Sequence, residues 1–162
     1  MIEKNTPGLW DKFWKPSSVE EDLFSVKKEE NSVRWRKIEK GILKKFGSFN
    51  KLKVIEIGAG SGTNALLFAL RGADVSVLDY SKKALERSEI FFQRHKVNVK
   101  LIFQNALKLK ESTKNKFDVS LSFGLAEHFQ GKERKKRDGQ RTVLCAYVTR
   151  HGFHSRSQRH GL

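Results

Sequence analysis

Three glycines at alternate positions, 58, 60 and 62, form the part of this sequence best suited to hold a ligand. They lie between an apolar stretch at residues 54–57 and a helix-forming stretch at residues 64–70. Glycine adopts backbone conformations that other residues resist, and its small size lets a ligand approach the main chain. The helix that begins after the loop offers unpaired N–H groups. This order of strand, glycine loop and helix predicts a cradle for a nucleotide cofactor.

A second candidate group is the carboxylate of Asp79, which ends the next strand pattern at residues 73–78. An acid at the end of the second strand of a βαβ unit can accept hydrogen bonds from ribose hydroxyls. Alternatively, Asp79 and Ser81 could cap the helix expected at residues 82–95. We favour the ribose role, because Ser81 can cap that helix without Asp79.

The spacing of the glycines separates two classes of cofactor. A dinucleotide loop requires G-x-G-x-x-G, but here the third glycine comes one residue early, at Gly62, and Thr63 stands where that loop needs glycine. With Glu56 two residues before Gly58, the segment instead resembles motif I of the class I S-adenosylmethionine-dependent methyltransferases, apolar-Glu-x-Gly-x-Gly-x-Gly. The resemblance implies S-adenosylmethionine as the cofactor. A nucleotide-linked oxidoreductase is the less favoured enzyme.

The resemblance extends over roughly residues 50–131 and implies roles for individual residues. Glu56 would orient the glycine loop, Asp79 would hold the ribose, and Asn105 would contact the adenine after a third strand at residues 97–103. The family commonly has an acid at that last position, and a plain turn role for Asn105 is equally open. The expected cofactor-binding residues are Glu56, Gly58, Ala59, Gly60, Gly62, Asp79, Tyr80, Asn105 and Ala106.

A fourth strand pattern, at residues 117–123, leads into the segment Gly124-Leu125-Ala126-Glu127-His128-Phe129. This segment resembles the methyltransferase loop that lies beside the reactive methyl group. His128 is a weak candidate for a catalytic base, and a packing role at a helix start is favoured, so the catalytic residue stays unknown. Methyl transfer from a sulfonium depends chiefly on in-line positioning of the nucleophile, which makes a dedicated base optional. Asp118 is expected to pair with the backbone.

The expected fold is α/β, a Rossmann-like three-layer sandwich with parallel strands ordered 3-2-1-4, part of the seven-stranded sheet that the family implies. Strands 1 and 4 would flank the switch point at which such a sheet binds its ligand. Three regions are expected: a helical extension at 1–50, a cofactor-binding core at 51–136 and a basic tail at 137–162. At 162 residues the chain is one domain at most.

The N-terminal region shows two helical patterns. A cluster on one helical face precedes Pro16, and it consists of Leu9, Trp10, Phe13 and Trp14. Ser18 and Glu21 resemble a capping box, and a second helix is expected at about 29–46, with core contacts from Val33, Ile38, Ile42 and Leu43. The resemblance implies that N-terminal helices fold over the cofactor; packing of both tryptophans against the sheet is the alternative.

Charge and cysteine content limit the partners. The net charge is +15, yet the basic residues are dispersed and lack interleaved aromatic residues, so nucleic acid stays open as a partner but is not indicated. A small-molecule methyl acceptor is expected, and neither a membrane span nor a metal cluster is. The single cysteine, Cys145, excludes an internal disulfide and suits a cytoplasmic protein.

The last 26 residues differ in composition from the rest of the chain. From Arg137 onward there are five arginines and no lysine, whereas residues 1–136 contain 22 lysines and six arginines. We hypothesise that the tail is the product of a frameshift; a genuine basic extension or a cloning scar is the alternative. A truncated chain would leave the fourth strand at the sheet edge, open to self-association. A catalytically dead remnant that binds the cofactor or a polyanion is therefore the second functional hypothesis.

Overall fold

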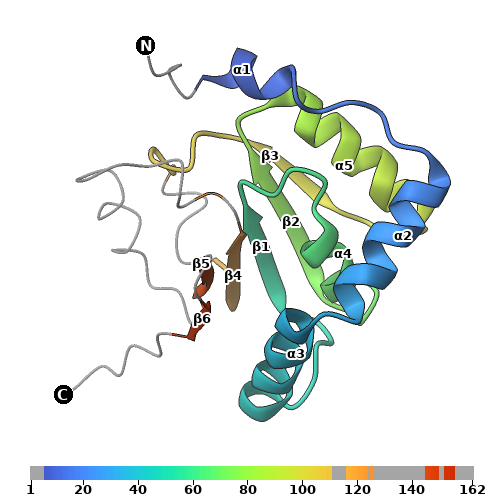
Figure 1. Cartoon of the computed structure of the whole chain (residues 1–162). Helices are drawn as coiled ribbons and strands as arrows, with labels where there is room; N and C mark the ends of the chain where they lie inside the picture. Colours follow the sequence, from blue (N-terminus) through green and yellow to red (C-terminus); the bar gives the residue numbers. More distant parts are fainter. Residues whose placement is uncertain (1–5, 111–115, 124, 126–144, 150–151, 156–162) are drawn as a thin grey trace.

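The computed structural model describes residues 6–110, 116–123, 125, 145–149 and 152–155, and centres on one six-stranded sheet (Figure 1). The strands are β1 (Lys53–Ile57), β2 (Asp74–Asp79), β3 (Lys100–Phe103), β4 (Val119–Phe123), β5 (Cys145–Thr149) and β6 (Gly152–Ser155). The helices are α1 (Pro7–Asp11), α2 (Val19–Glu30), α3 (Val33–Phe46), α4 (Thr63–Ala69) and α5 (Lys82–Arg94).

The expected order of the first four strands is confirmed. The sheet runs β3-β2-β1-β4-β5-β6, and β1 pairs in parallel with both β2 and β4. Ile57 is opposite Leu78, and Glu56 is opposite Leu121, so the carboxyl ends of these three strands lie at one edge of the sheet. The glycine loop after β1 and Asp79 at the end of β2 therefore lie at the same edge.

The expectation that β4 forms an edge of the sheet is wrong. Strand β5 pairs with β4 in parallel, from Ser120 opposite Cys145 to Phe123 opposite Val148, and β6 then pairs antiparallel with β5. Both added strands come from the region expected to lie outside the fold. The backbone of β5 satisfies the N–H and C=O groups that β4 would otherwise expose.

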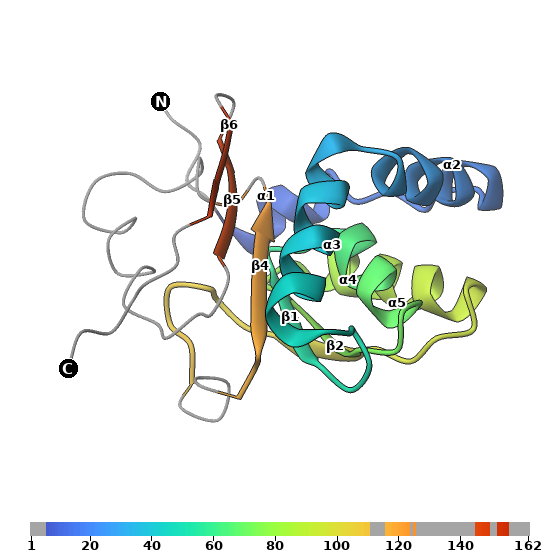
Figure 2. The ribbon, with the colours of Figure 1, turned by 90° about the horizontal axis from the view of Figure 1, so that it is seen from below.

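The two faces of the sheet are covered differently. Helices α3, α4 and α5 lie on one face, with α2 outside them (Figure 2). The largest core cluster lies on that helical side and includes the fully buried Trp35, Phe68 and Phe92. A second, smaller core cluster is built around Ile55 and Leu78. In the part of the chain that the structure describes, no helix side chain belongs to this cluster; the partly buried side chains that pack on it are Ile102 of β3 and, from irregular segments, Ala106, Leu109, Phe117 and Leu125.

The N-terminal helices follow local capping signals. The capping box of Ser18 and Glu21 is present at the start of α2. The helix expected from residue 29 is interrupted, because the Ser32 side chain accepts a hydrogen bond from Trp35 N and begins a new helix, α3. Ile38 and Ile42 are buried as expected. Val33 and Leu43 are wrong as core contacts, because the inward face of α3 carries Trp35 instead.

Among the described residues, no helix combines the length and the apolar composition needed to cross a membrane. The same residues contain no group of three or more His, Cys, Asp or Glu side chains placed to hold a metal ion.

Candidate functional site

The glycine loop after β1 depends on backbone conformations that favour glycine. Gly58, Gly60 and Gly62 have φ values of +65°, +57° and +74°. Side-chain-bearing residues rarely adopt this left-handed region, because the Cβ atom approaches the following carbonyl oxygen. The loop is tied to the neighbouring strand, since Gly58 N donates to the carbonyl oxygen of Leu78 over 2.7 Å. The alternating glycines therefore set the shape of the loop.

Asp79 connects the glycine loop to the start of α5. Its Oδ2 accepts a hydrogen bond from Gly60 N at 3.1 Å, and its Oδ1 accepts one from Ser81 N at 2.9 Å. Burial raises the pKa of Asp79, and these backbone hydrogen bonds offset part of that effect. Helix α5 itself is capped by Ser81, whose Oγ accepts from Ala84 N. The structure thus brings Asp79 to the loop, where the backbone of Gly60, Tyr80 and Ser81 donates to its carboxylate.

Ser88 is a loop contact that sequence reasoning missed. Its Oγ donates to the carbonyl oxygen of Gly60 over 2.6 Å, and the residue is fully buried within α5. Both polar groups of the Gly60 peptide units are therefore held by side chains, Asp79 and Ser88. A small polar residue on the apolar inner face of a helix is the only signal that could have revealed it.

Glu56 holds the helix that follows the loop. Its Oε2 accepts from Ala65 N at 2.8 Å, in the first turn of α4, and its Oε1 accepts from Asn64 Nδ2 at 3.4 Å. The side chain is buried under the loop, and burial raises the pKa of Glu56 to about 7 despite these hydrogen bonds. Glu56 thus contacts the helix that follows the loop, and its role in orienting the loop stays a prediction.

Three other expected site residues take different positions. Asn105 is exposed and forms a turn, because its Oδ1 accepts from Leu107 N at 2.8 Å. Ala106 packs against the smaller core cluster. Tyr80 is half-buried beside Asp79 and shares a side-chain hydrogen bond with Trp10. His128 lies outside the described residues. The Asn105 side chain thus forms the turn that the sequence analysis gave as the alternative to an adenine contact.

Two side chains from distant segments cover the glycine loop. A Cβ atom added at Gly60 would lie 2.1 Å from the Trp14 ring, and one added at Gly58 would lie 2.8 Å from Leu125. The Cα surfaces of both glycines are therefore in contact with these side chains. Sequence reasoning placed Trp14 on a helical face, but α1 ends at Asp11, so the ring is carried by the irregular chain after it. Only the tertiary structure shows this contact.

The residues at this edge fit a nucleoside-containing cofactor. The glycines keep the loop backbone free of side chains of its own, and neighbouring side chains pack where a Cβ at any of the three would lie. The adjoining carboxylate of Asp79 is a hydrogen-bond acceptor for ribose hydroxyls. The surrounding Trp14 and Leu125 offer apolar surface, as ligand sites generally do.

The chain is similar in sequence to two curated methyltransferases. The ubiquinone biosynthesis O-methyltransferase of Pelagibacter ubique (strain HTCC1062) is 27% identical over 124 residues, which cover 73% of this chain and 49% of the relative. The protein of the same name from Rickettsia prowazekii (strain Madrid E) is 26% identical over 105 residues, or 65% of this chain and 41% of the relative. The chain thus spans about half the length of these relatives, or less.

Solved structures share the fold. The magnesium protoporphyrin IX methyltransferase of Synechocystis PCC 6803, with bound S-adenosylmethionine, has a TM-score of 0.58 and 17% identity, over 80% of this chain and 61% of that one. In sequence, residues 54–138, just over half of the chain, match the profile of the family described as "Methyltransferase domain". The chain therefore belongs to the methyltransferase domain family.

Proposed function

We propose that this chain binds S-adenosylmethionine at the carboxyl ends of β1, β2 and β4, and that it supplies the cofactor-binding part of an O-methyltransferase. The observation that carries the proposal is the hydrogen bond between Gly60 N and Asp79 Oδ2 at 3.1 Å. It joins the glycine loop and the ribose-binding acid into one unit at the switch point of the sheet. A glycine loop alone, or an acid at the end of a strand alone, would be a less specific sign of a nucleoside site.

Each residue of this unit has a defined task. The bound cofactor supplies a methyl group on a sulfonium. Asp79 accepts hydrogen bonds from the ribose beside those that it accepts from the backbone of Gly60, Tyr80 and Ser81. The backbone of Gly58 to Gly62 lies against the amino-acid end of the cofactor. Glu56 holds the first turn of α4 in place through its hydrogen bond with Ala65 N. These contacts fix the position of the cofactor, which is the main requirement of an in-line transfer.

The acceptor is proposed to be a small molecule with an acidic hydroxyl group. The names of both curated relatives specify O-methyl transfer. Among the described side chains that contact the loop, Trp14, Ser88 and Leu125 are not general bases, and Asp79 is assigned to the ribose. An acceptor that ionises readily needs less help from a base, and a phenolic hydroxyl with a pKa of about 10 is a suitable group.

Calorimetry on the purified chain tests the cofactor site. S-adenosylhomocysteine should bind, and NAD should bind far more weakly. Asp79→Ala should weaken the binding by about 2–4 kcal/mol, because charge-assisted hydrogen bonds are lost. Asp74→Ala is the matched control, since Asp74 is an exposed acid at the opposite end of the same strand. Equal affinities for both variants would remove Asp79 from the site.

A cofactor-binding remnant without transfer activity is the alternative function. It has the same binding properties, so only a transfer assay separates the two. Radiolabelled S-adenosylmethionine and a panel of small phenols should give a methylated product if the proposal holds. Tight cofactor binding with no transfer to any phenol would favour the remnant.

A further inference from the structure

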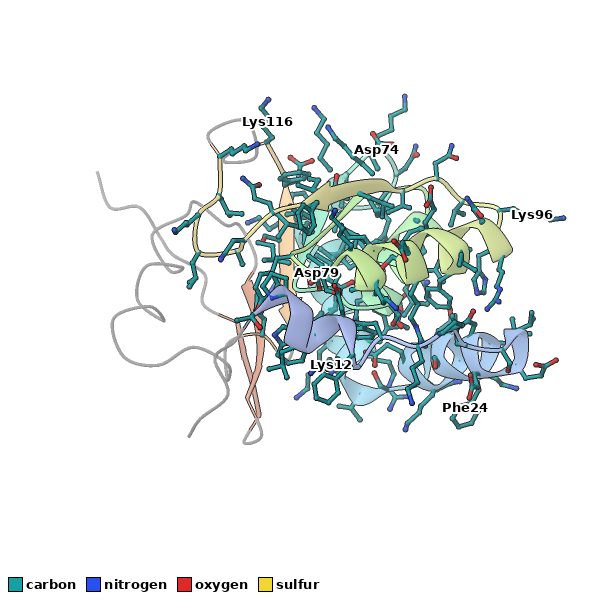
Figure 3. All side chains as sticks on the ribbon, turned by 90° about the horizontal axis from the view of Figure 1, so that it is seen from above. Lys12, Phe24, Asp74, Asp79, Lys96 and Lys116 are labelled. Atoms are coloured by element: carbon teal, nitrogen blue, oxygen red, sulfur yellow. The ribbon has the colours of Figure 1, made fainter. Side chains whose placement is uncertain are left out.

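We infer that the domain carries a second ligand site, a groove at the amino ends of β2 and β3, and that this groove takes a small amphipathic carboxylate. It is distinct from the proposed cofactor site, because the two lie at opposite ends of the same strands. Asp79 is the last residue of β2, whereas Asp74, in the wall of the groove, is the first. Figure 3 shows Asp74 and Lys96, another groove residue, apart from Asp79 and on the side away from Lys12.

The groove forms where two neighbouring segments run together without strand pairing. Strand β3 pairs with β2 only from Lys100, opposite Ser76, and residues 97–99 have no strand structure. The turn between α4 and β2 contributes the rest of the lining. The groove has a volume of about 540 Å³, which lies within the range of about 300–1,000 Å³ that small-molecule sites occupy.

The lining combines apolar walls with exposed cations. Its buried and half-buried side chains are all apolar: Ala69, Ala73, Val75, Val97 and Val99. Its exposed residues include one acid, Asp74, which has Lys53 beside it as its partner in the β1–β2 register. The other two charged residues are Lys96 and Lys100. Neither lysine has an ion-pair partner among the described residues, so both ammonium groups can bind an anion.

Lys96 occupies a backbone position at which glycine is the usual residue. Its φ of +55° is left-handed, its N–H donates to the carbonyl oxygen of Gln93, and the N–H of Val97 donates to that of Phe92. These are the two hydrogen bonds of a Schellman motif, whose left-handed residue is most often glycine. A lysine there lowers stability relative to glycine. Because strained residues cluster at functional sites, the strain supports a binding role for the Lys96 side chain.

A small amphipathic carboxylate matches both properties of the groove. Its apolar chain would lie against the valine and alanine side chains, where burial removes apolar surface from water. Its carboxylate would accept charge-assisted hydrogen bonds from Lys96 and Lys100. A cation of the same shape would instead meet two ammonium groups of like charge.

Titration of octanoate into the isotope-labelled full chain, followed by NMR, tests the inference. The amide signals of residues 72–75 and 96–100 should shift and reach saturation, whereas those of the glycine loop should stay in place. Octylamine has the same apolar chain with the opposite charge, and it should bind at least fivefold more weakly. Saturating S-adenosylhomocysteine should leave the Kd for octanoate within twofold, because the two sites are separate.

Two lysine variants separate the charge of Lys96 from its backbone strain. Lys96→Gly should weaken octanoate binding about fivefold, the upper value for an exposed ion pair, and should raise the melting temperature by about 2–4 °C. Lys51→Gly is the matched control, because Lys51 is exposed, has a similar φ of +61° and does not line the groove. It should raise the melting temperature equally and leave the Kd within twofold.

Contrary results would each overturn the inference. If Lys96→Gly gained stability and kept the wild-type Kd, the strained lysine would have no role in binding. Tighter binding of octylamine than of octanoate would rule out a carboxylate as the ligand. Displacement of octanoate by S-adenosylhomocysteine, or unshifted signals at residues 96–100, would rule out a second site at this end of the sheet.

Discussion

At the scale of single residues, the buried carboxyl group of Glu56 is the part of the site most sensitive to pH. Burial raises its pKa to about 7, while its hydrogen bonds and the charge of Arg34 lower it, and Glu29 raises it. In the unfolded chain the pKa returns to its ordinary value of about 4.5. Between these two values the unfolded chain loses a proton that the folded chain keeps. The free energy of unfolding should therefore fall as pH rises from 4.5 to 7, by roughly 3 kcal/mol in total.

Glu56→Gln should remove this pH dependence. Glutamine keeps an acceptor for Ala65 N, and its amide can donate to Asn64 Oδ1, which is buried and has no hydrogen-bond partner in the described structure. Urea unfolding at pH 5 and pH 8 checks the prediction. The variant should equal or exceed the wild type in stability at pH 8, and its two values should agree. A variant that retains the wild-type slope would show that another group is responsible.

The second residue-scale prediction separates strain from crowding in the glycine loop. Gly60→Ala places a side chain at a φ of +57° and against the Trp14 ring. Gly47→Ala, at the end of α3, has a comparable φ of +77° but nothing within 4 Å. Both should lose about 1 kcal/mol of stability from backbone strain.

Cofactor affinity should distinguish these two glycine variants. Gly60→Ala should weaken the binding of S-adenosylhomocysteine more than tenfold, because Trp14 has to move, whereas Gly47→Ala should not change it. Thermal unfolding and calorimetry provide the two measurements. Equal affinities would show that Gly60 matters only for its backbone conformation. A side chain at Gly60 would point toward Trp14, which already lies in that direction.

The contacts of single residues could be predicted from the sequence where the partner is close in sequence or is placed by the strand order. Asp118 pairs with backbone as expected, since its Oδ2 accepts from Lys53 N at 2.8 Å. Glu56 and the glycines precede their own helix, so their relation to it follows from the chain. Trp14 and Ser88 were not assigned to the loop, because their contacts with Gly60 depend on how distant helices pack.

At the scale of elements, one ion pair fastens α2 to α5. Asp22 is almost fully buried on α2 and pairs with Arg94 at the end of α5. Arg94 also donates to the carbonyl oxygens of Ser17 and Ser18, just before α2. Helix α2 presents few apolar side chains to the core, with Val26 its only buried one. Its attachment therefore depends strongly on this pair.

Arg94→Met should destabilise the fold by about 2 kcal/mol, because it leaves the Asp22 carboxylate buried without its cation. The value is below that of fully buried pairs, since the Arg94 side chain is 31% exposed. Asp22→Asn combined with Arg94→Met should recover part of the loss, and denaturant unfolding of the single and double variants checks this. Additive losses would mean that the pair contributes nothing beyond packing.

Elements were predictable where local chemistry decides them. The capping box of α2 and the serine cap of α5 follow from local sequence, and the parallel order of β1 to β4 follows from the βαβ pattern. The break between α2 and α3 was missed, because Asn31 and Ser32 fit a continuous helical pattern until Ser32 is seen to cap Trp35 N. Strands β5 and β6 were missed, because their sequence carries no strand period and only the pairing of β5 with β4 and of β6 with β5 defines them.

At the scale of the whole molecule, the question is how residues 137–162 relate to the methyltransferase domain. The family match ends at residue 138, next to the change from lysine to arginine at Arg137. These two observations support our proposal that the tail is read in a shifted frame. The nucleotide sequence beyond codon 137 tests it. Absence of an extended second frame that encodes the family's next strand would contradict the proposal.

The tail nevertheless adds two strands to the sheet, and this leads to a prediction that does not depend on its origin. Removing residues 137–162 would unpair the outer edge of β4, an apolar parallel strand with Val119 and Leu121 buried. Such an edge presents free N–H and C=O groups to a second chain. The shortened chain should therefore self-associate in light scattering and unfold less cooperatively than the full chain. Removing only residues 156–162 keeps β5 and β6 and should leave the chain unchanged. A shortened chain that stays monomeric and unfolds like the full chain would show that β5 and β6 do not stabilise the domain.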